Sequence, residues 1–301
     1  MASLASRPRN PVLLGIVITA VCVSFLPMGD AISKHLMQRI SPIEVVWGRY
    51  VVQLVIAIVV VAANMARLGS AAPGTTIIAT RQWRLQILRG VAVFASSLCL
   101  IASFQFIPLV DAISIIFLGP ILAVILSARL LGERVGWHRW AAVCVGFLSV
   151  LMILKPGMGL VHWAASLALV AALINSSHQL MTRRLAATEP ALTTFAWSSA
   201  AGLAAATLAL PFGWTAPAWA DWALLSVGGI FLAIAQYGQV LALRFAPVSA
   251  VAPFNYTTIP AALVVGFVVF GELPDAMGFA GATLLILAGL YAFRRERTAS
   301  V

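Results

Sequence analysis

Long apolar stretches separated by short charged segments cover almost the whole chain. Ten stretches contain at least fifteen residues without Asp, Glu, Lys or Arg, namely 10–29, 50–66, 90–110, 112–128, 140–154, 156–182, 190–220, 222–243, 245–271 and 276–293. A helix needs about 20 mostly apolar residues to cross the hydrocarbon core of a bilayer. A membrane β-barrel would alternate in polarity, and these stretches do not. The pattern therefore predicts an all-α membrane protein with ten transmembrane helices, because a helix satisfies its own backbone in lipid.

The composition agrees with this pattern and removes several classes of function. Hydrophobic residues make up 62% of the chain and charged residues 9%, whereas a soluble domain is roughly one quarter charged. The short connections leave no room for a soluble catalytic domain. Cys22, Cys99 and Cys144 fall inside predicted spans without a C-x-x-C pair, so we expect no metal and no cofactor.

The basic residues predict how the chain is oriented. If the N-terminus is cytoplasmic, only Lys34, Arg39 and Lys155 face outside, Arg49 falls within a span, and the other 15 of 19 basic residues face the cytoplasm. This bias matches the positive-inside rule and predicts a bacterial inner-membrane protein with both termini cytoplasmic. The net charge of +10 does not indicate nucleic-acid binding, because the arginines are scattered over loop ends. The expected partners are the lipid bilayer and a small-molecule substrate.

An internal repeat divides the chain into two halves. Phe106-Ile-Pro108 precedes Gly132-Glu133, and Phe245-Ala-Pro247 precedes Gly271-Glu272, with an offset of 139 between the copies. Residues 33–39 also resemble residues 177–183 at an offset of 144. We therefore predict two five-helix repeats, 11–155 and 160–293. Because five is odd, the second repeat enters the membrane from the opposite side, an arrangement typical of secondary transporters with a midplane site between the halves.

These motifs together resemble one known family. The segments that carry the resemblance are Pro108 to Glu133, Pro247 to Glu272, Gly29 to Lys34 and Pro42 to Arg49. The chain resembles the drug/metabolite transporter superfamily, and within it the EamA-type branch. The resemblance implies a ten-helix carrier that moves a small organic solute across the inner membrane. The expected activity is export of an amino acid or a derivative, including a metallophore, by alternating access; the alternative is uptake of a heteroaromatic nutrient such as riboflavin.

Arg49 is the candidate binding residue that the pattern singles out most clearly. It lies about 10 Å inside its predicted span at 1.5 Å per residue, and a guanidinium at that depth needs an anionic or carbonyl partner. One hypothesis is a clamp for a substrate carboxylate or phosphate. The other is a structural ion pair, whose candidate partners are Glu44, Asp30 and Asp111. Gln53 lies one turn further along the same face.

Other polar and aromatic residues inside the spans complete the predicted site. The remaining candidate substrate-binding residues are Trp47, Asn175, Gln236, Tyr237, Asn255 and Tyr256. Residues 255–258 form a polar break between two prolines, which free backbone carbonyls. Protons are the candidate coupling ion, with Asp30, Glu44, Asp111 and His178 as the groups that could carry them.

Two further expectations concern the glutamates and enzymatic activity. Glu133 and Glu272 each follow a glycine at a helix end, so we expect them to cap or anchor rather than catalyse. An alternative class, a membrane enzyme, would require a motif such as H-E-x-x-H, G-x-S-x-G or a phosphate-binding loop. The sequence contains none of these motifs, and we therefore predict that the protein is not an enzyme.

Overall fold

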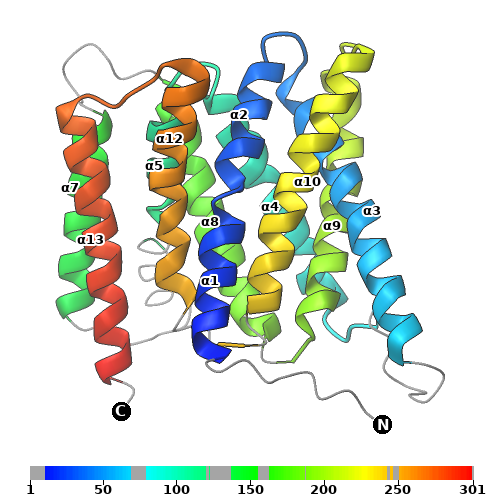
Figure 1. Ribbon diagram of the computed structural model, residues 1–301, viewed down its shortest axis with the longest axis horizontal. Helices are drawn as coiled ribbons and strands as arrows, with labels where there is room; N and C mark the ends of the chain where they lie inside the picture. The colour runs from blue at the N-terminus through cyan, green and yellow to red at the C-terminus, as the bar shows by residue number, and fades with distance from the viewer. Residues whose placement is uncertain are drawn as a thin grey trace.

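The protein is a bundle of upright helices. The computed structural model (Figure 1) describes residues 11–68, 79–119, 122, 137–154, 163–186, 188–242, 245–246 and 251–299. Its α-helices are α1 Pro11–Val23, α2 Leu26–Leu36, α3 Pro42–Leu68, α4 Trp83–Ser103, α5 Leu109–Ile116, α7 Trp137–Leu154, α8 Ala165–Ala186, α9 Ala191–Ala209, α10 Trp219–Ala242, α12 Thr258–Phe270 and α13 Ala276–Ala299. Two 3-10 helices are η2 Leu210–Phe212 and η3 Ala252–Thr257. No strand occurs in these ranges, and the predicted all-α membrane fold is confirmed.

The lengths and faces of the helices fit a lipid environment. Five helical stretches are long and apolar enough to cross a membrane, with mean hydropathy from 1.3 to 2.3: Pro11–Leu36, Pro42–Ala66, Trp83–Ser103, Leu192–Phe212 and Trp219–Gln239. Large apolar side chains such as Ile58, Val59 and Val268 are 59%, 60% and 74% exposed. Arg49 and Gln53, in contrast, are buried. Apolar groups outside and polar groups inside are what a bundle in lipid requires.

The arrangement in space brings distant segments together. In Figure 1 the start of α1 and the end of α13 lie at the same edge of the bundle, and α7 lies beside α13 at one end. Gly281 permits this pair to pack closely, because a Cβ there would lie 2.7 Å from the carbonyl oxygen of Ser149. Gly132, Glu133 and Pro247, which mark the repeats in the sequence, lie outside the described residues. The division into repeats at 11–155 and 160–293 stays a prediction.

Several helices begin earlier than the charge pattern suggests. The third helix starts at Pro42 and the fourth at Trp83, whereas the charge-free runs start at residues 50 and 90. Arg89 consequently lies inside α4 and not in a loop. The prediction that Arg49 is the single cation within a span is wrong, because charged side chains with partners inside the bundle do not end a helix.

The described chain departs from α-helical geometry at three places inside the bundle. Residues Ser24 and Phe25 form a turn between α1 and α2, and α5 ends at Ile116, with Phe117 as its C-cap. The 3-10 helix η3 precedes α12 and contains three of the four residues of the predicted polar break, so the predicted interruption there is confirmed. Broken helices in the interior of transporters expose backbone groups to the solute.

The close approach of α1 and α10 gives a test of the packing. A Cβ at Gly238 would overlap the Cβ and Sγ atoms of Cys22, whereas a Cβ at Gly228 on the same helix would meet nothing closer than 3.6 Å. We expect Gly238→Ala to destabilise the protein by about 1–3 kcal/mol through overpacking. Gly228→Ala is the matched control and should be neutral or slightly stabilising through helix propensity. Thermal unfolding in detergent measures both, and equal midpoints would contradict the packing described here.

Candidate functional site

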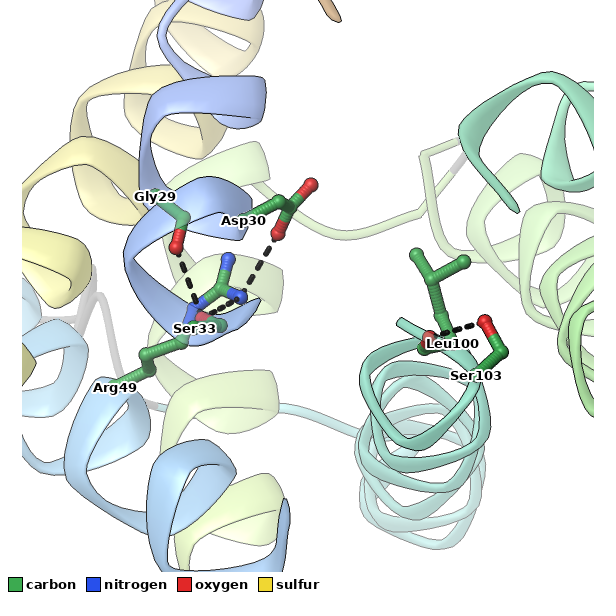
Figure 2. Close-up of polar contacts among 6 residues, drawn as sticks. All are labelled: Gly29, Asp30, Ser33, Arg49, Leu100 and Ser103. Atoms are coloured by element: carbon green, nitrogen blue, oxygen red, sulfur yellow. Dashed lines mark hydrogen bonds and ion pairs between the residues drawn. The ribbon is translucent and has the colours of Figure 1, made fainter. Parts of the chain in front are cut away.

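A buried charged cluster joins α2 to α3. The Arg49 Nη1 atom donates to Asp30 Oδ1 at 2.9 Å and to Ser33 Oγ at 3.0 Å, and the Ser33 hydroxyl donates to the Gly29 carbonyl at 2.9 Å. Figure 2 shows these contacts. Arg49 and Asp30 are only 5% and 8% exposed. The structural ion pair with Asp30, one of the alternatives that the sequence left open, is therefore formed.

The cluster retains unused hydrogen-bonding capacity. The second carboxylate oxygen of Asp30 points away from Arg49 in Figure 2, toward the side on which Leu100 and Ser103 of α4 lie. The Nε atom of Arg49 is buried and has no hydrogen-bond partner among the described residues. An unsatisfied buried donor costs about 1–3 kcal/mol, so this cluster is polar and incompletely satisfied.

An amide network lies one turn from Arg49 along α3. The Gln53 Nε2 atom donates to Ser199 Oγ at 3.0 Å and to Gln236 Oε1 at 3.3 Å. These contacts connect α3 with α9 and α10. Two of the predicted site residues, Gln53 and Gln236, are thus in direct contact. The Oε1 atom of Gln53 is buried without a partner in the described part of the chain.

Aromatic rings lie at the helix interruptions. The rings of Phe117 and Tyr256 are 5.3 Å apart, and these two residues are separated by 139 positions, the offset of the sequence repeats. Phe25, at the break between α1 and α2, stacks on Phe231 with centroids 5.7 Å apart and an interplanar angle of 14°. An open-sided hollow of about 400 Å³ adjoins this break, lined by Ala20, Val21, Ser24, Phe25 and Thr257. Flat rings in parallel offer a surface on which another ring can stack.

The ends of α2, α5 and α12 are tied together at one edge of the bundle. The Lys34 Nζ atom lies 2.5 and 2.7 Å from the two carboxylate oxygens of Glu272. Oε2 of Glu272 also accepts from the Leu109 N–H at 3.2 Å, which caps the start of α5. Gly271, at φ 67°, makes the left-handed turn that ends α12. The expected anchoring role of Glu272 is confirmed, and we call this set of contacts the end latch.

Glu44 and Trp47 have other partners near the start of α3. Ser41 Oγ accepts from the Glu44 N–H at 3.3 Å, and the Glu44 carboxylate accepts from the Ser41 N–H at 3.1 Å, which is a capping box. The same carboxylate binds the N–H and hydroxyl of Thr215. The Trp47 Nε1 atom donates to Thr207 Oγ1 at 3.0 Å, and its ring meets two further tryptophan rings edge-on. Glu44 therefore anchors the helix start, and Trp47 belongs to an aromatic group at the bundle's edge.

The remaining predicted residues lie in three separate places. Asn175 accepts from Gln179 at 2.7 Å on α8, beside Gly119, which lies three residues after the end of α5. Tyr237 packs on Phe195, with centroids 6.4 Å apart. Asn255 is half-buried in η3, next to Tyr256.

Three features of the site could not be located from the sequence alone. Ser199 accepts a hydrogen bond from Gln53, and the ring of Phe117 packs on that of Tyr256. Arg89 donates hydrogen bonds to Thr182 on α8 and Ser198 on α9. Ser199 and Phe117 give no sequence signal. Arg89 was expected in a loop, because the charge-free run of that helix begins only at residue 90.

The described helices and their buried polar groups define a helical membrane protein, and the comparisons specify its family. The EamA-like transporter family model matches residues 10–155. A riboflavin transporter of Vibrio cholerae is 31% identical over 79% of each chain. One from Rhizobium johnstonii is 35% identical over 65% of each chain, so the match spans slightly less than two thirds of that relative. The chain belongs to the EamA-like transporter family of the drug/metabolite transporter superfamily, whose members are transporters and not enzymes.

Other relatives carry different names. The S-adenosylmethionine uptake transporter of Rickettsia prowazekii is 23% identical over 90% of this chain and 89% of its own length. The pseudopaline exporter of Pseudomonas aeruginosa is 27% identical over 70% of this chain and 75% of its own length. A crystal structure that is 18% identical superposes with a TM-score of 0.66 over 97% of this chain and 99% of the other, which shows the fold.

The Arg49–Asp30 pair predicts a non-additive response to substitution. Arg49→Ala leaves a buried carboxylate unpaired and should destabilise the protein by about 3–5 kcal/mol. The charge-neutral double substitution Asp30→Asn with Arg49→Gln should recover most of that loss, because it leaves no buried charge unpaired. Thermal unfolding of the single and double variants gives the coupling free energy. Additive effects would mean that Asp30 does not hold Arg49. The clamp hypothesis, in which Arg49 is free to bind substrate, predicts that result.

Proposed function

We propose that this protein is a secondary carrier that takes up a flat heteroaromatic metabolite of the flavin type. The observation that carries the proposal is that the buried charge of Arg49 is already paired with Asp30, whereas aromatic rings lie near the helix interruptions. A neutral ring system fits such an interior better than a carboxylate does. The names of the Vibrio and Rhizobium relatives support the same substrate class.

The proposed substrate contacts are stacking and hydrogen bonding at the breaks. Phe25 and Phe231 supply a parallel aromatic surface at the edge of the hollow. Gln53 and Gln236 supply amide groups, which match the alternating carbonyl and N–H groups of a flavin ring edge. Asn255 and Tyr256 on η3, Asn175 on α8 and Tyr237 on α10 are further candidate contacts.

A second candidate function is export of an amino-acid-derived metabolite, including a metallophore. The observation in its favour is the similarity to the pseudopaline exporter. In that case a substrate carboxylate would have to displace Asp30 from Arg49 during each cycle. This exchange costs more than binding to an unpaired arginine, and it is the reason that we place export second.

Transport would proceed by alternating access, with the end latch as the closed side. The latch joins the ends of α2, α5 and α12 through Lys34 and Glu272, and these ends must separate for a solute to enter there. We propose that this edge faces the outside and that both termini lie in the cytoplasm of a bacterial inner membrane, which the distribution of basic residues supports. Asp30 is the proposed proton carrier, because its second oxygen is directed away from Arg49. Glu44 and Asp111 are less suitable: Glu44 is used as a cap, and Asp111 has an interaction of its own.

Breaking the latch should open the outer side. Ser103 is buried at the end of α4 on this side, and Ser103→Cys in a background lacking Cys22, Cys99 and Cys144 reports access. We expect Glu272→Gln to raise the rate of modification by a membrane-impermeant thiol reagent several-fold, because the ion pair is lost. Arg39→Gln is the control, since Arg39 is 59% exposed and lies 3.8 Å from Asp221 outside the latch. Unchanged rates in Glu272→Gln would contradict the role of the latch.

Counterflow in proteoliposomes tests the substrate. Vesicles loaded with unlabelled riboflavin should transiently accumulate labelled riboflavin from outside. Phe25→Leu should raise the half-saturation concentration about fivefold, which corresponds to roughly 1 kcal/mol of lost ring contact. Trp219→Leu, at a ring that is 91% exposed, should have no effect. Counterflow of a metallophore-like amino acid without counterflow of riboflavin would replace the proposal by the second candidate.

A further inference from the structure

An apolar groove lies between α7 and α13, the pair of helices at one end of the bundle in Figure 1. Leu287 and Tyr291, which form part of its wall, are 57% and 43% exposed, so the groove is open at the surface of the bundle. Because the bundle lies in a bilayer, an open apolar surface at this place meets lipid. The groove has a volume of about 300 Å³ and is lined by Ala141, Val145, Leu284, Leu287, Ala288 and Tyr291.

The packing of the pair shows where the groove ends. The two helices are antiparallel: Gly281, early in α13, lies against Ser149, late in α7, whereas the groove joins later residues of α13 to earlier residues of α7. From that contact, Arg294 is thirteen residues further along α13 and Trp137 twelve residues back along α7, about 18–20 Å in each case at 1.5 Å per residue. Arg294 is therefore level with the first turn of α7. Trp137 and Trp140 begin that helix, and tryptophan is enriched at the level of the lipid headgroups.

Positive charge is concentrated at this end of the groove. The last turns of α13 contain Arg294, Arg295 and Arg297 together with Glu296, and the first turn of α7 contains Arg139. Four arginines and one glutamate leave a net charge of about +3 next to the headgroup level. Basic clusters directly beside membrane-spanning helices attract anionic lipids, and basic pockets between such helices bind phospholipid headgroups.

We infer that the α7–α13 groove is a binding site for an anionic phospholipid. One acyl chain lies along the apolar lining, and the phosphate lies beside the arginines at the end of the groove. The two features are complementary to the two parts of one molecule: a soluble anion would use the arginines and not the groove, and a zwitterionic lipid brings no net charge to the arginines. The site goes beyond the proposed function, because α7 and α13 carry none of the contacts proposed for the transported solute.

Thermal unfolding of the full chain in detergent measures this binding, because a bound lipid raises the midpoint as the lipid concentration rises. Dioleoyl phosphatidylglycerol and dioleoyl phosphatidylcholine are compared at equal mole fractions in the detergent micelles. Their acyl chains are identical, so the comparison isolates the charge of the headgroup. We expect phosphatidylglycerol to raise the midpoint at mole fractions at which phosphatidylcholine has little effect.

A first pair of variants tests the headgroup end. Arg294→Gln combined with Arg295→Gln should raise the mole fraction of phosphatidylglycerol needed for half of the effect about 30-fold, which corresponds to roughly 1 kcal/mol for each arginine. Arg81→Gln combined with Arg84→Gln is the matched control. It removes the same charge at two exposed positions near the start of α4 and should respond as the parent does.

A second pair of variants tests the groove itself. Ala141→Phe fills the groove while it keeps every arginine, and it should weaken phosphatidylglycerol binding several-fold. Leu148→Phe is the control, since Leu148 also lies on α7 and is 53% exposed, but is not part of the groove lining. This control should bind the lipid as the parent does.

Several outcomes would overturn the inference. These are equal rises with the two lipids, or an unchanged response in Ala141→Phe and in the double variant of Arg294 and Arg295. A rise with sn-glycerol 3-phosphate alone that equals the rise with the lipid would assign the arginines to a soluble anion. A dimer in light scattering that Ala141→Phe dissociates would place a second copy of the chain in the groove. If the double variant does not fold, native mass spectrometry of the parent in an equimolar mixture of the two lipids decides: we expect preferential retention of phosphatidylglycerol, and equal retention contradicts the site.

Discussion

The need to match every charge inside an apolar layer determines how this bundle is held together. Ionised groups are expensive in hydrocarbon unless they are paired, and the protein meets this need between helices. Asp30 and Ser33 on α2 hold Arg49 on α3, and Glu272 after α12 holds Lys34 on α2 while it caps α5. Each contact fixes the relative position of two or three helices. Apolar packing against lipid alone would leave those positions undetermined, because lipid chains are as apolar as the side chains.

The helix interruptions obey the same requirement that polar groups in the apolar layer have partners. A helix in lipid satisfies its own backbone, so a break is tolerated where neighbouring residues cover it. Ser24 donates to the carbonyl of Ala20 at 2.7 Å, and Thr257 donates to that of Phe254 at 2.7 Å. The rings of Phe117, just after α5, and Tyr256, in η3, pack against each other. Short-range hydroxyl contacts and aromatic cover thus make irregular backbone possible in the interior, where a carrier needs groups that can change partners.

The sequence predicted the helical membrane fold, because hydropathy is a property of whole spans. It also predicted that Arg49 lies in the interior, because a single charge within an apolar span must avoid lipid. It also predicted the interruption near Asn255, since two prolines flank it. The sequence offered three acidic residues as partners of Arg49 and could not select Asp30 among them. Asp30 is 19 residues away in the sequence, and its contact with Arg49 depends on how α2 and α3 pack in the folded protein. Asp30 and Lys34 lie four residues apart on α2, yet each pairs with a residue of another segment, Arg49 and Glu272. Arg89 was misplaced for a related reason: a charge ends a helix in lipid only when no neighbour accepts it, and Thr182 and Ser198 do.

The pairing of Arg49 also bears on how one fold serves several substrates. Relatives of this chain are named for riboflavin, S-adenosylmethionine and pseudopaline, which differ in size and charge. If the arginine on α3 were the substrate clamp, each change of substrate would expose a buried charge at a cost of several kcal/mol. With ionised Asp30 as its counter-ion, Arg49 requires no negative charge from the solute. Under the proposed function, selectivity depends on uncharged residues such as Phe25, at the break between α1 and α2, and Gln236, inside α10. Replacing them leaves the ion pairs of Arg49 and Lys34 intact.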